Sequence, residues 1–410
     1  MATWGELEKS GTKWRDLEEM TWGELEEFCV INPKTKQIPD DIEVSFVPMQ
    51  SVSDTGDVQT DEVRKASEVK KGFTFFEEGD VLFAKITPCM ENGKGGIARG
   101  LKNGVGFGST EFHVLHPDPE KVSSEWLYYL TSWDEFRKQC ARNMTGSAGQ
   151  KRVPKSYLEH YKVHLPPLEE QRRIATLLDK VSDLIAKRRA QLDKLDLMVK
   201  SRFVEMFGDP VLNPMKWPEH PLENMTDIVS GITKGRKTKE TELIEVPYMA
   251  VSNVKDGYID WTTVKTILAT KSEIEQYHLL PDDVLMTEGG DPDKLGRGAI
   301  IQKPLENCIH QNHIFRVRLD EKLLLPSYFA EFLQHQKAKQ YFLRCAKQTT
   351  GIASINMRQL KGLPTLVPPI EIQVHFNDFL ERTRQSKLTI QQSLDKLEIL
   401  KKARMQKCFD

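Results

Sequence analysis

The amino-acid sequence is written twice, and this repetition limits the folds open to the chain more than any other feature. Four segments of the first half recur in the second half in the same order, at offsets of 202 to 205 residues. The pairs are GDVLFAKI (79–86) and DDVLMTEG (282–289), CARNMTG (140–146) and CAKQTTG (345–351), PPLEEQ (166–171) and PPIEIQ (368–373), and LDKL (192–195) and LDKL (394–397). A shared order at nearly one offset indicates duplication, so both halves are expected to fold alike.

A long helix is predicted at the end of the first repeat, over residues 166–207. Its apolar residues recur at alternating steps of three and four, which is the spacing of a coiled-coil seam. They are Ile174, Leu178, Val181, Ile185, Leu192, Leu195 and Val199. Two prolines precede the helix, Glu169 and Glu170 fall in its first turn, and the proline-rich segment 208–218 ends it. About forty residues at roughly 1.5 Å each predict a rod on the order of 60 Å long.

A second helix of similar length is predicted over residues 368–410. Its seam consists of Leu380, Ile390, Leu394 and Leu397, and is interrupted at Thr383, Lys387 and Lys401. Two rods with apolar stripes are expected to pack on each other. Each also carries apolar residues beside the seam, which predicts contacts with further helices of a partner. These are Leu177 and Leu184 in the first rod and Phe379 and Leu388 in the second.

The sequence before each long helix predicts an α+β module. Short apolar runs of strand type, such as 81–86 and 314–319, alternate with turns rich in Gly, Asn, Asp and Pro, and a helical stretch follows them. The expected organisation is therefore a module over 1–165, a helix over 166–207, a second module over 208–367 and a helix over 368–410.

Composition excludes several classes of protein. The chain has 410 residues, 39% of them hydrophobic, which suits two or three packed domains. Its apolar runs are too short to span a bilayer and its N-terminus lacks the pattern of a secretion signal, so we expect a cytoplasmic location and no membrane partner. Six dispersed cysteines and ten unclustered histidines predict reduced thiols and no metal site.

The motifs of common enzymes are missing from the sequence. It has no phosphate-binding G-x-x-x-x-G-K-[ST] loop, no H-E-x-x-H and no G-x-S-x-G, and it lacks the N/D-P-P-aromatic tetrapeptide of adenine methyltransferases. We therefore expect no catalytic residue and no cofactor in this chain.

Polar loops in both halves carry side chains suited to nucleic acid. Amides and cations hydrogen-bond to base edges, and small residues let the backbone approach phosphates. The DNA-binding candidates are Lys85, Thr87, Glu91, Asn92, Lys94, Ser109, Gln150, Lys151, Arg152 and Lys155 in the first half, and Lys234, Arg236, Lys237, Lys239, Lys294, Arg297, Gln311, Asn312, Asn356 and Arg358 in the second. Any one such loop fits an ordinary solvated surface, but their recurrence in both halves favours binding. A net charge of −2 leaves three alternatives: the chain does not bind nucleic acid, its positive charge is local, or partners supply part of that charge.

The whole chain resembles the specificity (S) subunit of type I restriction–modification enzymes. The resemblance rests on the duplicated layout, on the helix entry PPLEEQRRIATLLD (166–179) with its copy PPIEIQVHFNDFL (368–380), and on FEEGDVLFAKITPCMENGKGGIA (76–98), GFGSTEFHVLHP (106–117) and FGDPVLNPMKWP (207–218). The second helix entry departs from the first, having EIQVHFN in place of EEQRRIA, so its partner contacts are expected to differ.

The resemblance implies a mechanism. Each module would be a target recognition domain that reads one half of a split site in double-stranded DNA. The helices would form an antiparallel spacer, in pseudo-two-fold symmetry, around which two methyltransferase (M) subunits pack and which restriction (R) subunits join. S-adenosylmethionine, ATP and Mg²⁺ would bind those partners. The alternatives left open are a stand-alone methylation system without a nuclease, a coiled-coil scaffold that binds proteins rather than DNA, and an autonomous nuclease or methyltransferase.

Overall fold

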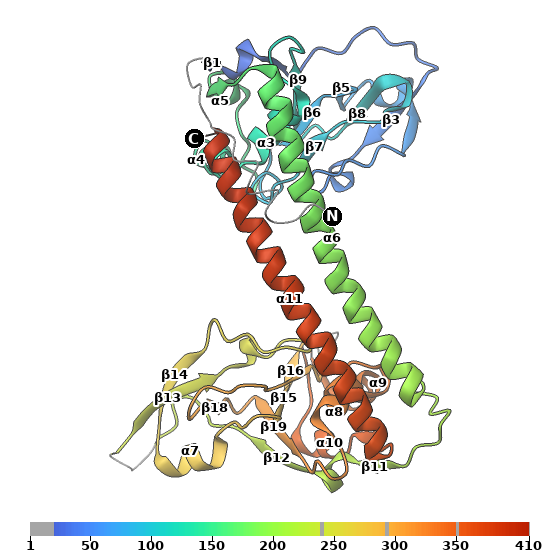
Figure 1. The fold of residues 1–410 in the computed structure, drawn as a ribbon, viewed down its shortest axis with the longest axis vertical. Coiled ribbons are helices and arrows are strands. Elements are labelled where there is room, and N and C mark those ends of the chain that lie inside the picture. Colours follow the sequence, from blue (N-terminus) through green and yellow to red (C-terminus); the bar gives the residue numbers. More distant parts are fainter. Residues whose placement is uncertain (1–19, 238–241, 292–294, 350–351, 410) are drawn as a thin grey trace. The chain divides into compact units, whose positions relative to one another are not determined.

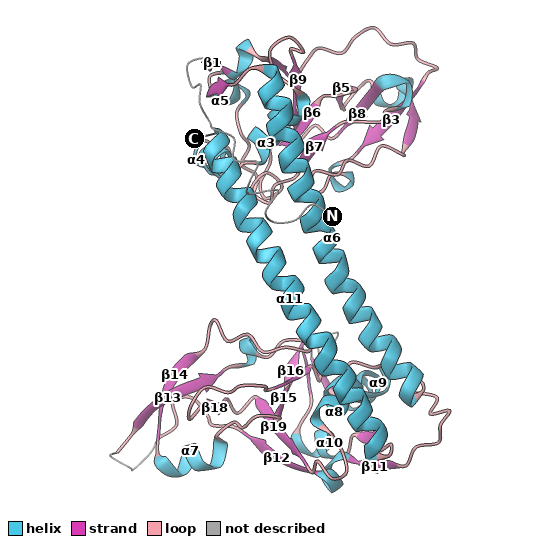
Figure 2. Cartoon of the chain, in the orientation of Figure 1, coloured by secondary structure: helices cyan, strands magenta, loops and turns pink. Residues whose placement is uncertain are grey.

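A computed structural model of the chain describes residues 20–237, 242–291, 295–349 and 352–409. These fall into two compact units. Unit 1 contains the described residues up to Arg188 together with those from Ser393 onward, and unit 2 spans Arg189–Gln392. Each unit mixes helices and strands and contains one module plus a part of both long helices (Figure 2). The α+β prediction for both halves is confirmed.

The module of unit 1 contains two four-stranded sheets (Figure 1). The first has the order β2 (Cys29–Ile31), β9 (Phe112–Pro117), β6 (Val81–Ala84), β7 (Gly95–Ile97), and the second the order β4 (Val63–Lys65), β3 (Glu43–Val47), β8 (Val105–Gly108), β5 (Thr74–Glu77). Helices α3 (Ser124–Ser132), α4 (Asp134–Arg142) and α5 (Lys155–Glu159) follow. Strand β10 (Lys162–Leu165) then pairs antiparallel with β1 (Thr21–Glu24). Through this pairing, strand β1 belongs to the module.

The module of unit 2 repeats this topology. Its four-stranded sheet has the order β12 (Thr226–Ser230), β19 (Ile314–Leu319), β15 (Val284–Thr287), β17 (Gly298–Ile300), and β14 (Lys265–Ala269), β13 (Ile244–Met249) and β18 (Ile309–His310) form a second sheet. A third sheet joins β16 (Gly289–Gly290), β21 (Ile352–Ser354) and β20 (Lys347–Thr349), and β11 (Glu219–Pro221) pairs with β22 (Pro364–Leu366). The helices are α7 (Lys271–Tyr277), α8 (Pro326–Phe332), α9 (Gln336–Cys345) and α10 (Met357–Lys361).

Strand β6 shows why these short apolar runs become central strands. All four of its residues are at most 2% exposed. Val81 and Phe83 belong to the core cluster that includes helix α3, whereas Leu82 belongs to a separate cluster between the sheets. Since successive side chains of a strand point to opposite faces, both faces of this sheet are covered. Strand β15 divides in the same way, with Val284 and Met286 in one cluster and Leu285 in another.

The long helices are α6 (Leu168–Phe207) and α11 (Ile370–Phe409), each of 40 residues, as the seam pattern predicts. In unit 1 the first turns of α6, with Leu178, share a core cluster with Phe409 at the end of α11. In unit 2 the end of α6 meets the start of α11, where Phe203 and Phe207 lie with ring centroids 5.5 and 5.4 Å from Phe376. Within each unit the helices are therefore antiparallel, and each module core includes the end of the helix that follows the other module.

The seam residues are buried to different degrees. Those 8% exposed or less are Ile174, Leu178, Val181, Ile185, Val199, Leu394 and Leu397, while Leu192, Leu195, Leu380 and Ile390 are half-buried. The three residues expected to interrupt the second seam all have partners. The Thr383 hydroxyl donates to the carbonyl of Phe379 at 2.9 Å, Lys387 pairs with Asp196, and the Lys401 ammonium lies 5.8 Å from the ring centroid of Tyr129.

The residues beside the seam need one correction. The sequence predicted that Phe379 contacts a helix of a partner. In the structure it packs against the core cluster of unit 2 instead. Leu177 and Leu184 are half-buried, and Leu388 is 53% exposed. None of the described helices combines the length and the apolar character needed to cross a bilayer.

Candidate nucleic-acid interface

Three of the polar segments singled out in the first half meet at the end of strand β6. The N–H of Lys85 donates to the carbonyl of Glu111 at 2.9 Å, that of Thr87 to Lys151 at 3.0 Å, and that of Val153 to Lys85 at 2.9 Å. Residue 152 forms isolated β-bridges with Ile86 and Thr145. Backbone pairing therefore brings the segments 84–96, 109–111 and 145–155 to one surface of unit 1.

An ion pair fastens this surface. Arg152 donates to the Glu111 carboxylate through Nε at 2.9 Å and Nη2 at 2.8 Å, and its Nη1 donates to the carbonyl of Gln150 at 3.0 Å. The hydrogen bond from Arg152 lowers the pKa of Glu111, which therefore stays ionised. Burial lowers the pKa of the adjacent Lys85 ammonium, and the charge of Glu111 opposes that shift. The result is a cluster of two cations about one carboxylate.

The other candidates of unit 1 differ in whether their side chains have hydrogen-bond or ion-pair partners. The Lys94 ammonium donates to the carbonyl of Met49 at 3.2 Å, Lys155 pairs with Glu159 at 2.7 Å, and the Ser109 hydroxyl accepts from the N–H of Glu111. Thr87 and Glu91 share a hydrogen bond of 3.3 Å. The exposed side chains without a partner among the described residues are those of Asn92, Gln150 and Lys151, so these three are available to a ligand.

In unit 2 the structure gives several candidates a local role. Arg236 donates to Glu273 through Nε at 2.5 Å, and this bond raises the pKa of Arg236 and lowers that of Glu273. The side-chain oxygen of Asn356 caps helix α10 by accepting from the N–H of Gln359 at 2.9 Å. The Gln311 side chain accepts from the N–H of Val251 at 3.3 Å.

The remaining candidates of unit 2 are spread over several loops and helix α10. Lys234, Lys237 and Arg358 are exposed, Asn312 lies 3.5 Å from the His313 ring, and Arg297 has a buried Nε without a partner among the described residues. Lys239 and Lys294 lie outside the described residues. No single surface that holds all ten candidates of this half is defined by these contacts.

The sequence analysis missed two acidic residues that lie beside the candidate loops: Glu111 and Glu288. In unit 2 the N–H of Glu288 donates to the carbonyl of His313 at 3.0 Å, and the N–H of Ile355 to Glu288 at 2.8 Å. This is the backbone pattern of Lys85, Glu111 and Val153 in unit 1. The repeat offset of 202 to 203 residues aligns these positions and would have found them.

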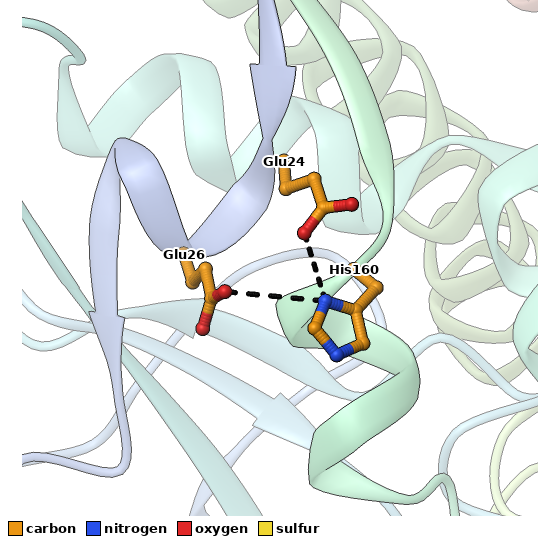
Figure 3. Close-up of side chains that lie close together, drawn as sticks. All are labelled: Glu24, Glu26 and His160. Atoms are coloured by element: carbon orange, nitrogen blue, oxygen red, sulfur yellow. Dashed lines mark hydrogen bonds and ion pairs between the residues drawn. The ribbon is translucent and has the colours of Figure 1, made fainter.

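One further cluster lies on unit 1, at the outer edge of its module. Figure 3 shows His160, which follows α5, with Glu24 and Glu26 around its Nδ1 at 2.8 and 3.9 Å. These are the only described side chains grouped closely enough to ligate a metal ion, and all three are partly or largely exposed. Spacing missed them because they are far apart in the sequence. The hydrogen bond with Glu24 raises the pKa of His160. His160, Glu24 and Glu26 thus form an ion-pair group, here called the clip, that links β1 to the end of α5.

Together, these features define a class: a duplicated α+β protein whose two modules share one backbone pattern beside their polar loops. A family model described as "Type I restriction modification DNA specificity domain" matches residues 17–195 and again residues 214–399. The chain belongs to this family and contains two copies of its domain. Nothing in the comparisons favours the non-DNA scaffold left open by the sequence.

Relatives and solved structures agree with this membership. The specificity subunit of the type I restriction enzyme EcoEI of Escherichia coli is 43% identical over 177 residues, which are 43% of this chain and 30% of that protein. The EcoAI specificity subunit of Escherichia coli is 44% identical over 154 residues, or 37% and 26% of the two chains. The chain thus spans less than a third of the length of these relatives.

The likeness to solved structures covers nearly the whole chain. A chain from a type I restriction–modification system is 18% identical with a TM-score of 0.59, covering 95% of this chain and 97% of that one. The type I S subunit of M. genitalium is 13% identical with a TM-score of 0.55, covering 95% and 96%. At these identities the likeness establishes the fold alone.

Proposed function

We propose that this chain is the DNA-specificity subunit of a type I restriction–modification complex and that each module reads one half of a bipartite site. The observation that carries the proposal is the duplicated surface, in which the same backbone pattern gathers polar loops in both modules. The names of the relatives support it, since both are specificity subunits. Asn92, Gln150 and Lys151 in unit 1 and Lys234, Lys237 and Arg358 in unit 2 are the contacts we favour, because their side chains are exposed.

The division of labour follows the two repeats. Residues 1–165 and 208–367 serve as target recognition domains, and residues 166–207 and 368–410 serve as helices that set the spacing between half-sites and dock two methyltransferase subunits. Exposed apolar side chains on the helices support a docking role. In unit 2, Leu197 is 63% and Leu388 is 53% exposed, although the helices bury other leucines well. Apolar groups left in water at such positions favour a protein partner.

Catalysis belongs to the partners in this proposal. The chain itself is non-catalytic, adenine-N6 methylation comes from M subunits that bind S-adenosylmethionine, and cleavage comes from R subunits that use ATP and Mg²⁺. The complex acts on double-stranded DNA in the cytoplasm. With 58 basic and 60 acidic residues, the chain depends on local cations and on its partners to neutralise phosphates.

The proposal is tested by DNA binding as a function of salt. The chain, purified with its cognate methyltransferase, is titrated against fluorescent duplexes at several salt concentrations. The logarithm of the affinity should fall linearly with the logarithm of the salt concentration, because bound cations release counterions from DNA. Affinity that is absent, or that does not respond to salt, would refute the DNA-binding role. Methylation without any cleavage activity would favour the stand-alone methylation system.

A further inference from the structure

The two modules carry opposite charges at equivalent positions of the same backbone frame. In unit 1, Arg152 is bridged to Ile86 and Thr145, and in unit 2, Ser354 pairs in the same way with Gly289 and Lys347. Beside these bridges, Lys85 corresponds to Glu288 and Glu111 corresponds to His313, as the paired backbone hydrogen bonds establish. A basic side chain therefore lies beside a carboxylate in both modules, Lys85 beside Glu111 in unit 1 and His313 beside Glu288 in unit 2, with the acidic and basic positions exchanged.

The surroundings make the difference larger. In unit 1 Arg152 binds the Glu111 carboxylate through two hydrogen bonds and Lys85 lies near enough to lower its pKa, so two basic side chains surround one carboxylate. In unit 2 the position of Arg152 is taken by Ser354, and the partner of the Glu288 carboxylate within the described part of the chain is the Nδ1 of His313 at 2.5 Å. This cluster is negative or neutral, according to the charge of the imidazole.

We propose that these clusters are the specificity-determining residues of the two modules, and that they give the half-sites different chemistry at one equivalent base position. The inference rests on the proposed function, because it requires that the modules read DNA. Lys85 and Arg152 offer donors, which match the O6 and N7 acceptors of guanine. Glu288 offers an acceptor, which matches the amino group of cytosine or adenine. Glu111 is a positioning residue that holds the donors of Arg152 in a fixed orientation.

The exposure of these side chains favours a role in DNA recognition over a role in the stability of the fold. Side chains of the Glu111–Arg152 pair are 25% and 42% exposed, and those of Glu288 and His313 are 33% and 56% exposed. Ion pairs this exposed contribute little to folding. Two parallel hydrogen bonds between a guanidinium and a carboxylate mainly fix the orientation of the arginine side chain. A side chain that reads a base needs such a fixed orientation.

The test uses the chain in its complex with the methyltransferase, expressed in cells whose own adenine methylation has been deleted, and maps methylated adenines by long-read sequencing. Glu111→Gln keeps the shape of the side chain but weakens its hold on Arg152, and Glu288→Gln removes the charge of the acceptor in unit 2. Each variant should lower the discrimination between bases at one position of its own half-site by about tenfold. The sequence preference of the other half-site should not change. The exposed Lys138→Glu serves as the control in unit 1, and Glu111→Asp should restore most of the discrimination.

A variant that exchanges the chemistry sharpens the test. Lys85→Glu combined with Glu111→His and Arg152→Ser gives unit 1 the side chains of unit 2. The recognised motif should then have cytosine or adenine in place of guanine at one position of the first half-site. An unchanged motif in Glu111→Gln and Glu288→Gln, or an equal effect on both half-sites, would overturn the inference. Failure of the proposed function looks different, because the wild-type complex would then show no bipartite motif.

Discussion

Gln171 and Gln373 occupy the same position in the two repeats and make the same three hydrogen bonds. The Gln171 side chain accepts from the N–H of Ser123 at 3.0 Å and donates to the carbonyls of Lys121 and Pro166, both at 2.9 Å. The Gln373 side chain accepts from the N–H of Leu325 at 2.8 Å and donates to Leu323 at 3.1 Å and Pro368 at 2.8 Å. Both residues are 0% exposed. Each fixes the first turn of a long helix to the start of α3 or α8 in its own unit.

Replacement of either glutamine by leucine should destabilise its unit. Gln171→Leu and Gln373→Leu keep the bulk of the side chain but leave an N–H and two carbonyls without their partner, one carbonyl buried and the other groups partly buried, at up to about 1–3 kcal/mol for each unsatisfied group. Urea unfolding should therefore show a lower midpoint than in the wild type. The exposed Gln385→Leu on α11 should stay within about 0.5 kcal/mol of it. Equal stability of all three variants would contradict the role given to the paired glutamines.

Aspartate at two leucines of α6 should separate core packing from docking. Leu178 is 1% exposed and belongs to the core cluster of unit 1, so Leu178→Asp should lower the free energy of unfolding by roughly 3–5 kcal/mol. Leu197 is 63% exposed, so Leu197→Asp should leave unfolding almost unchanged yet weaken binding of the methyltransferase. Size-exclusion chromatography of the mixed proteins measures that binding, with the exposed Lys194→Asp as control. If Leu197→Asp bound the methyltransferase as tightly as the wild type, Leu197 would not belong to the docking surface.

Acid should weaken unit 1 through a buried histidine. Burial lowers the pKa of His113 from 6.5 to about 4, and its ring is hydrogen-bonded to the carbonyl of Val153 at 2.8 Å. Because the unfolded chain binds the proton more readily, the stability is complete above pH 6.5 and is lost as the pH falls from 6.5 towards 4. The loss amounts to about 3 kcal/mol over that window. His113→Gln should be less stable at pH 7 but should lose less on acidification, and a slope equal to that of the wild type would count against this assignment.

The clip at His160 should respond to pH in the opposite direction. The hydrogen bond with Glu24 raises the pKa of His160, so its contribution is complete below the ordinary histidine pKa and disappears as the pH rises through the raised value. Amide hydrogen exchange in β1 should therefore speed up at alkaline pH beyond the intrinsic effect of base. His160→Gln should abolish this extra acceleration, and if it persists in that variant the clip has another origin.

The sequence predicted the parts of the fold that depend on local pattern. Alternating apolar steps of three and four specify a helix from local sequence alone, and the structure contains the two long helices α6 and α11. Duplication was readable because the same core contacts keep the same residues, as at Gln171 and Gln373. The role of these glutamines was not readable, since their partners lie about fifty residues earlier in the chain.

The candidate site was predictable only in outline. Composition identified the polar loops, but the structure distinguishes Asn92 and Gln150, which are free, from Asn356, which caps a helix. Glu111 was missed because its role depends on its contact with Arg152, 41 residues further along the chain, which the sequence does not show. Phe379 was misjudged because helical spacing cannot show which neighbour covers a side chain beside the seam.

The most direct measurement of the central claim is the methylated motif of a chimaera in which residues 1–165 come from a family member of different specificity. The account predicts a bipartite motif in which the first half-site alone changes, while the second half-site and the number of base pairs between the halves are kept. A motif that changes in both halves, or methylation at an undivided sequence, would contradict the assignment of one half-site to each module.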